Sequence, residues 1–237
     1  MLLNIKRALL IQPGAYGDLM VCAPIAKWYA DKGYKVYWPI REKFMTVIKE
    51  FDYAIPIILK EETLHDDWMR SDVLQILSIA KNYDKVINLA DRGPHGPAQR
   101  HGESFEQCKY RLAEVPFEEK HTLEWVRDKK KEDELYDRYV KSSEYVFVHN
   151  TSSNKEIVVI PSSVDKPVVL CDDPEGYNIF DWYKVAIKAS EIYCTESSIW
   201  AFLDGIVHDL TEERYLLPRN KMSGSTVSTH WKKDYLK

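Results

Sequence analysis

The strongest indication of the fold is the stretch Ala8-Leu9-Leu10-Ile11-Gln12-Pro13-Gly14-Ala15-Tyr16-Gly17-Asp18-Leu19-Met20. An apolar run enters a turn with a proline and two glycines, and it leaves through an aspartate into a segment with helical spacing. This order predicts a buried parallel strand followed by a crossover helix. Ligands of open α/β sheets bind at the carboxyl ends of the strands, so this turn is a candidate site.

Composition excludes several classes of protein. The chain has 237 residues, 45% hydrophobic and 30% charged, with a net charge of −4, so no global field favours nucleic acid or anionic membranes. The four cysteines lack CxxC spacing and are expected to be free thiols in a reducing cytosol. The sequence shows neither a signal peptide nor a membrane span, and we therefore expect a soluble, cytoplasmic protein.

Strands and helices are expected to alternate through the first half. Apolar runs at 35–39, 53–59 and 84–89 predict further strands, and residues 18–31, 41–49 and 66–82 predict helices. Gly33 is suited to the left-handed position that ends the first helix. This alternation predicts a doubly wound parallel sheet.

Two further segments of the first half are candidates for the walls of this site. The loop after the fourth strand carries Asp91, Arg92 and His95, and either it forms a wall of the site or it is a solvated loop. Residues 103–114 predict a helix from which Lys109, Tyr110 and Arg111 extend. A charged helix over 121–142 reads as a solvated face and a boundary region, which divides the chain into domains 1–143 and 144–237.

The second half opens with a strand at 145–150 that ends in polar residues. Hydroxyl, amide and ammonium groups at a strand end suit phosphate oxygens, although a polar turn has the same composition. The candidate phosphate-binding residues of this loop are Thr151, Ser152, Ser153 and Lys155.

A second junction of strand and helix follows at 191–203. The start of a helix presents unpaired N–H groups and attracts phosphate, whereas ordinary capping by Thr195 or Ser197 is the alternative. The candidate residues here are Thr195, Glu196, Ser197 and Ser198, with Glu196 also a candidate acceptor from ribose hydroxyls. Arg219 is a candidate for binding a diphosphate or a surface arginine. The tail, 231–237, is expected to be a helix that returns to the first half.

Three motifs together resemble the heptosyltransferase-type (family 9) glycosyltransferases of the GT-B fold. Residues 8–28 resemble the family's first strand, its G-x-x-G-D loop and its helix, and 145–155 resemble the start of its donor domain. Residues 191–205 resemble its Asp-Ser-Gly segment, although the usual glycine and a histidine are missing. The chain also looks like small glycosyltransferase-like proteins of phages and algal viruses.

The resemblance implies a sugar nucleotide bound between two Rossmann-like halves, of which the second is reduced. It further implies inverting transfer without an essential metal or a tightly bound cofactor, with the role of general base mapping to Asp18. The first half then forms the acceptor side, with the candidate residues Gly14, Tyr16, Gly17, Asp91, Arg92, His95, Tyr110 and Arg111. The sequence has no Asp-x-Asp metal motif. The acceptor would be a glycan or a hydroxylated base in phage DNA, for which Arg92, Arg100, Lys109 and Arg111 are the local basic cluster.

Two other functions stay open. A non-catalytic nucleotide-sugar-binding protein with a decayed site would keep the fold without the chemistry. A dinucleotide-dependent oxidoreductase is the third class, although the spacing of Gly14 and Gly17 does not supply the G-x-G-x-x-G fingerprint.

Overall fold

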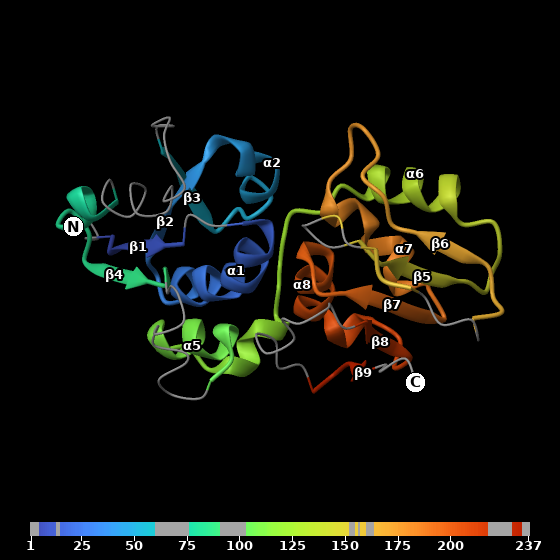
Figure 1. Cartoon of the computed structure of the whole chain (residues 1–237). Helices are drawn as coiled ribbons and strands as arrows, with labels where there is room; N and C mark the ends of the chain where they lie inside the picture. Colours follow the sequence, from blue (N-terminus) through green and yellow to red (C-terminus); the bar gives the residue numbers. More distant parts are fainter. Residues whose placement is uncertain are drawn as a thin grey trace. The chain divides into compact units, whose positions relative to one another are not determined.

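The computed structural model describes residues 5–12, 15–59, 76–90, 103–151, 155, 157–159, 164–217 and 229–233. The chain divides into two compact units, Met1–Val126 and Arg127–Lys237, and each is built on its own parallel sheet (Figure 1). The predicted α/β class with two Rossmann-like sheets is therefore confirmed. Within the described residues, no helix combines the length and the apolar character needed to cross a bilayer.

The first unit has the strand order β3-β2-β1-β4, with every neighbouring pair parallel. Its named elements are β1 (Arg7–Ile11), α1 (Tyr16–Asp31), β2 (Lys35–Arg41), η1 (Glu42–Phe44), α2 (Met45–Ile48), β3 (Ala54–Leu59), β4 (Lys85–Asn88), α5 (Phe105–Leu112) and η2 (Phe117–His121). The order runs outward from β1 to β3 and then resumes on the other side at β4. The carboxyl ends of β1 and β4 therefore flank the point at which a doubly wound sheet binds ligands.

The core of this unit forms around β1, whose residues Ala8–Ile11 are fully buried. Helix α1 packs beside α5 and η2 on one face of the sheet. On the other face, Leu9 and Ile11 pack with Leu59 and with Ile76 of the helical residues 76–80. Because both faces are covered, β1 is apolar throughout instead of alternating.

Helix α1 differs from its expected form at one end and matches it at the other. It begins at Tyr16 rather than at Asp18 and continues through Pro24, whose neighbours on both sides are buried. Burial of this long apolar stretch outweighs the backbone hydrogen bond that Pro24 cannot donate. At the other end, Gly33 has a φ of +82° and its N–H donates to the Ala30 carbonyl at 2.9 Å, so the predicted left-handed stop is confirmed.

The second unit has the strand order β6-β5-β7-β8-β9, again parallel throughout. Its elements are α6 (Lys129–Tyr139), β5 (Val146–His149), β6 (Val168–Leu170), η3 (Ile179–Trp182), α7 (Tyr183–Ile187), β7 (Glu191–Thr195), α8 (Ser198–Gly205), η4 (Val207–Asp209), β8 (Arg214–Leu217) and β9 (Lys232–Lys233). The order reverses between β5 and β7, so their carboxyl ends flank the equivalent ligand-binding point of this sheet.

Helix α6 belongs to the second unit, so the boundary lies before this helix rather than at 143. Helix α6 contacts η3 and α7, and its Asp133 forms an ion pair with Lys184 at 2.7 Å. Its Lys131 Nζ also donates to the Gly176 carbonyl at 2.9 Å. The charged sequence of α6 predicted a solvated face correctly, but it did not indicate which sheet the other face would cover.

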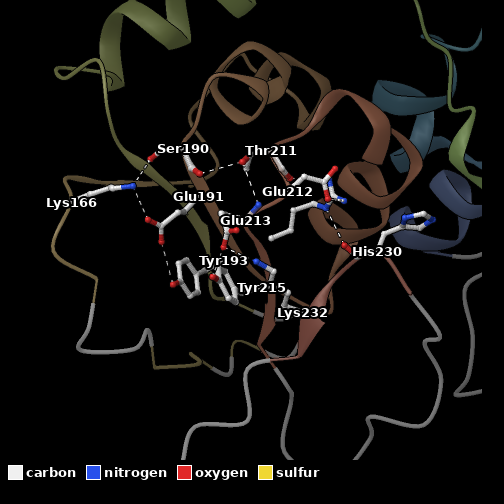
Figure 2. A network of polar contacts seen from close by, with 11 residues as sticks. Lys166, Ser190, Glu191, Tyr193, Thr211, Glu212, Glu213, Tyr215, His230 and Lys232 are labelled. Carbon is white, nitrogen blue, oxygen red and sulfur yellow. Dashed lines mark hydrogen bonds and ion pairs between the residues drawn. The ribbon is translucent and has the colours of Figure 1, made fainter.

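The described part of the tail also belongs to the second unit, so the expected helix returning to the first half is wrong for residues 231–233. Strand β9 pairs with β8, and Trp231 Nε1 donates to Asp204 at 2.8 Å. Figure 2 shows Lys232 reaching Glu213, at 2.7 Å, within a polar network that also contains the stacked rings of Tyr193 and Tyr215. These contacts tie β9 to the edge of the sheet.

Candidate functional site

Asp18 lies in the first turn of α1, the helix that comes next after β1 along the chain. Its Oδ2 accepts a hydrogen bond from the Ala15 N–H at 3.3 Å, and its Oδ1 lies 3.5 Å from Nζ of Lys109. The side chain of Asp18 is 21% exposed. The carboxylate is therefore held from two sides and still open to a solvent-borne molecule.

Lys109 on α5 is the residue that organises this edge of the sheet. Its side chain is fully buried, and its Nζ donates to Gln12 Oε1 at 2.5 Å and to the Leu89 carbonyl at 3.1 Å. Gln12 and Leu89 directly follow β1 and β4, the two strands between which the order reverses. One ammonium thus joins the ends of both strands to Asp18.

This burial corrects the expected role of Lys109 in a basic cluster for DNA, because a fully buried ammonium does not reach phosphates. Sequence reasoning treated the lysine as a residue extending into solvent. The signal that was missed is the spacing Phe105–Lys109, which places both residues on one helix face; in the structure the ammonium lies 4.2 Å from the centre of the Phe105 ring.

The other expected acceptor-side residues fall into four groups. Tyr16 and Arg111 are exposed or nearly so, with Tyr16 donating to the Lys43 carbonyl at 2.9 Å and Arg111 Nε pairing with Glu103 at 2.7 Å. Gly17 lies in the first turn of α1. Tyr110 is 1% exposed and donates to the Val21 carbonyl at 2.9 Å, so the expectation that it extends from the helix is wrong. Gly14, Asp91, Arg92 and His95 lie outside the described residues.

In the second unit, His149 and Ser197 meet where the strand order reverses. His149 is the last residue of β5, and its Nδ1 lies 3.1 Å from Oγ of Ser197, the N-cap of α8. Ser197 Oγ also accepts a hydrogen bond from the Trp200 N–H at 3.2 Å. Ser197 therefore caps the helix and also contacts His149. Sequence reasoning did not identify His149, because a single histidine at a strand end belongs to no recognisable motif.

The residues beside Ser197 line the same strand end. Thr195 is fully buried, and its hydroxyl has no hydrogen-bond partner within the part of the chain that the structure describes. Glu196 is 9% exposed, and Ser198 is the first residue of α8. Thr195 is the last residue of β7, and its hydroxyl faces the protein interior, whereas the helix start itself consists of Ser197 and Ser198.

The loop after β5 closes on itself. The backbone carbonyl of Asn150 accepts a hydrogen bond from the Val158 N–H at 2.8 Å, and the side-chain amide of Asn150 donates one to the Val158 carbonyl at 3.0 Å. Thr151 forms an isolated antiparallel bridge with Ile157, and Lys155 at the exposed surface has a φ of +64°. Thr151 and Lys155 thus belong to one loop at the end of β5. Ser152, Ser153 and Arg219 lie outside the described residues.

Burial lowers the pKa of His149 from its usual 6.5 to about 4. In the unfolded chain His149 takes up a proton near pH 6.5, whereas in the native state it does so only near pH 4. The contribution of His149 to the free energy of unfolding is therefore fully present above pH 6.5 and is lost as the pH falls toward 4. We expect the free energy of unfolding, measured by urea titration, to fall more steeply between pH 6.5 and 4 in the wild type than in His149→Gln. Equal slopes would contradict a buried neutral imidazole.

The part of the chain that the structure describes contains no cluster of potential metal ligands. Among those residues, no three His, Cys, Asp or Glu side chains are arranged to hold an ion. The four cysteines are buried and unpaired with one another, and burial raises the pKa of Cys22 to about 12. At that pKa the Cys22 thiol stays protonated and unreactive at neutral pH.

Comparisons with known proteins identify the fold. No family model matches the chain, and no curated protein matches it. The chain is similar to the crystal structure of the glycosyl transferase family 9 protein from Veillonella parvula DSM 2008, with a TM-score of 0.59 and 10% identity over 98% of this chain and 86% of that one. It is also similar to the bacterial iron-containing dodecameric glycosyltransferase TibC from enterotoxigenic E. coli H10407, with a TM-score of 0.55 and 9% identity over 98% of this chain and 62% of that one. The chain thus has a GT-B-like α/β fold.

Proposed function

We propose that this chain is a glycosyltransferase that moves a sugar from a nucleoside-diphosphate sugar to a hydroxyl acceptor. The observation that carries the proposal is Asp18, a partly exposed carboxylate fixed by Lys109 where the strand order of the first sheet reverses. The second sheet carries a helix start lined by hydroxyl groups at its own point of reversal. The likeness of the fold to that of family 9 structures supports the same assignment.

Asp18 is proposed as the general base. The acceptor hydroxyl oxygen attacks the anomeric carbon and forms the new glycosidic bond, while its proton passes to the Asp18 carboxylate. The bond from the anomeric carbon to the phosphate oxygen breaks, and its electron pair leaves with the diphosphate. Attack opposite to the leaving group inverts the anomeric centre, and proton removal contributes about 10²–10⁴-fold to the rate.

The second unit is proposed to hold the donor. The leaving diphosphate gains one negative charge, on the oxygen that was bonded to the anomeric carbon, and donors must stabilise it. The start of α8 and Ser198 supply neutral donors. Lys155 at the exposed surface supplies positive charge, and Thr195 and Arg219 stay predicted phosphate contacts. Ser197 acts through the helix it caps and through His149 rather than as a free hydroxyl. Thr151, Ser152 and Ser153 stay predicted phosphate contacts, and Glu196 a predicted acceptor from ribose hydroxyls.

Because these groups supply the positive potential, we propose that transfer needs neither a bound metal nor a tightly bound cofactor. A glycan acceptor is favoured over hydroxylated DNA, since the burial of Lys109 removes one member of the basic cluster on which DNA binding would depend. The cytoplasmic location, the likeness to viral proteins and the acceptor-side roles of Gly14, Asp91, Arg92 and His95 stay predictions.

A thermal-shift screen tests the proposal directly. The chain is melted alone and with UDP-, GDP-, ADP-, CMP- and dTDP-sugars, followed by an assay for hydrolysis or transfer with each binder. A donor at a hundredfold excess over its Kd stabilises the folded state by about 2.7 kcal/mol, which raises the melting temperature by several degrees. No shift with any of the sugars would contradict the proposal. A shift without hydrolysis or transfer would favour the non-catalytic binding protein.

A further inference from the structure

A cavity lies at the end of α1 opposite to Asp18. Its volume is about 300 Å³, and its lining residues are Trp28, Tyr29, Lys32, Tyr34, Lys85 and Glu114. They come from the end of α1, the turn between α1 and β2, the start of β4 and the segment that follows α5. Trp28 follows Asp18 on the same helix, and at 1.5 Å per residue the two are roughly 15 Å apart along its axis. The cavity is therefore separate from the site around Asp18.

Aromatic rings form the walls of this cavity. The rings of Tyr29 and Tyr34 meet edge to face, with their centres 5.7 Å apart. The Tyr29 hydroxyl donates to the Ala113 carbonyl at 2.7 Å, which anchors this ring in the fold. Trp28 is half-buried and supplies the third ring. Rigid aromatic walls offer a large contact area at a small cost in side-chain entropy.

Charged groups form the rim. The Lys32 ammonium lies 4.4 Å from the centre of the Trp28 ring, and Lys85 Nζ pairs with Glu114 Oε2 at 2.8 Å. Glu114 has a left-handed backbone, with a φ of +57°, which an L side chain adopts at a cost. The cavity thus combines apolar faces with both donors and a carboxylate acceptor at its opening.

We propose that this cavity binds a pyranose residue of a glycan. The C–H bonds of a sugar ring are partly positive and pack on the negative face of an aromatic ring. Neighbouring hydroxyls of the same ring can donate to a carboxylate such as Glu114 and accept from Lys32 and Lys85. Lys32, Lys85 and Glu114 together carry a net charge of +1, so the three aromatic rings, and not the charge, favour a sugar ring as the occupant. This binding involves neither Asp18 nor the nucleotide sugar, so it can be tested independently of the transfer reaction.

The test is a titration of ¹⁵N-labelled protein with chitotriose, maltotriose, cellotriose and mannotriose, in the absence of any nucleotide sugar. At least one of these is expected to shift the amide signals of Trp28, Lys32, Tyr34 and Lys85 in a saturable way. Trp28→Ala should weaken that binding about tenfold, whereas Trp28→Phe, which keeps an aromatic face, should retain most of it.

Glu114→Gly is the sharpest variant, because glycine suits the left-handed backbone at that position. It removes the carboxylate and should weaken binding several-fold while the melting temperature stays equal or rises. Lys130→Ala, at an exposed lysine of α6, is the matched control and should leave binding unchanged. The proposal is overturned if none of the four saccharides shifts these signals at millimolar concentration, or if Trp28→Ala and Glu114→Gly bind as the wild type does.

Discussion

Replacing Asp18 by asparagine should lower the rate of sugar transfer by about 10²–10⁴-fold while donor binding stays unchanged. Asparagine has nearly the same shape as aspartate, and its amide oxygen can still accept the hydrogen bond from Ala15. It cannot take a proton from the acceptor hydroxyl at neutral pH. The measurement is kcat and the donor Kd for both proteins, with the nucleotide sugar that the thermal-shift screen identifies.

Asp31→Asn is the matched control, since Asp31 lies at the other end of the same helix, where it forms an ion pair with Lys27 at 2.8 Å. This variant should transfer sugar at the wild-type rate. If Asp18→Asn also transferred sugar at the wild-type rate, the Asp18 carboxylate would serve only to cap the start of α1. The general base would then have to be another residue of the first unit.

Replacing Lys109 by methionine should lower the free energy of unfolding by about 3 kcal/mol, because it leaves buried polar groups without their donor. Gln12 Oε1 and the Leu89 carbonyl both lose the ammonium. The partial exposure of Asp18 allows water to compensate part of the loss there. Urea denaturation measures the effect, and Lys49→Met, at a lysine whose side chain is 59% exposed, is the matched control.

The same variant separates a positioning role from a purely structural one. Under conditions in which Lys109→Met remains folded, its kcat should fall while the donor Kd stays unchanged, because the lysine contacts Asp18 rather than the donor. Combining it with Asp18→Asn should add little further loss of kcat, since residues that act as a unit are not additive. A loss of stability below about 0.5 kcal/mol, the range of an ordinary surface substitution, would contradict the buried network.

The elements of the fold that depend on local pattern could be predicted from the sequence. The apolar run Ala8–Ile11 must be buried on both faces, which only a covered parallel strand allows. Gly33 ends α1 because the left-handed position that stops a helix favours glycine over residues with a Cβ. The position of Asp18 at the start of a helix followed from the same reasoning.

The parts that depend on tertiary partners could not be predicted. Lysine is almost always exposed, and the burial of Lys109 becomes favourable only when Gln12, Leu89 and Asp18 supply acceptors from three other segments. Helix α6 is amphipathic in either unit, so its pattern could not place the boundary. His149 becomes a candidate site residue only once β5 and β7 lie side by side and bring it to Ser197.

In the proposed reaction the second unit holds the diphosphate and the first unit supplies the base. The decisive measurement is a titration of ¹⁵N-labelled protein with UDP, GDP, ADP, CDP and dTDP, in which the amide signals that move are mapped. We predict that at least one of these shifts the signals of Thr195, Glu196, Ser197 and Ser198 at the start of α8, together with Lys155. Shifts centred on Gly17 and Asp18 with the second unit unchanged, or no shift with any of the five, would contradict the account.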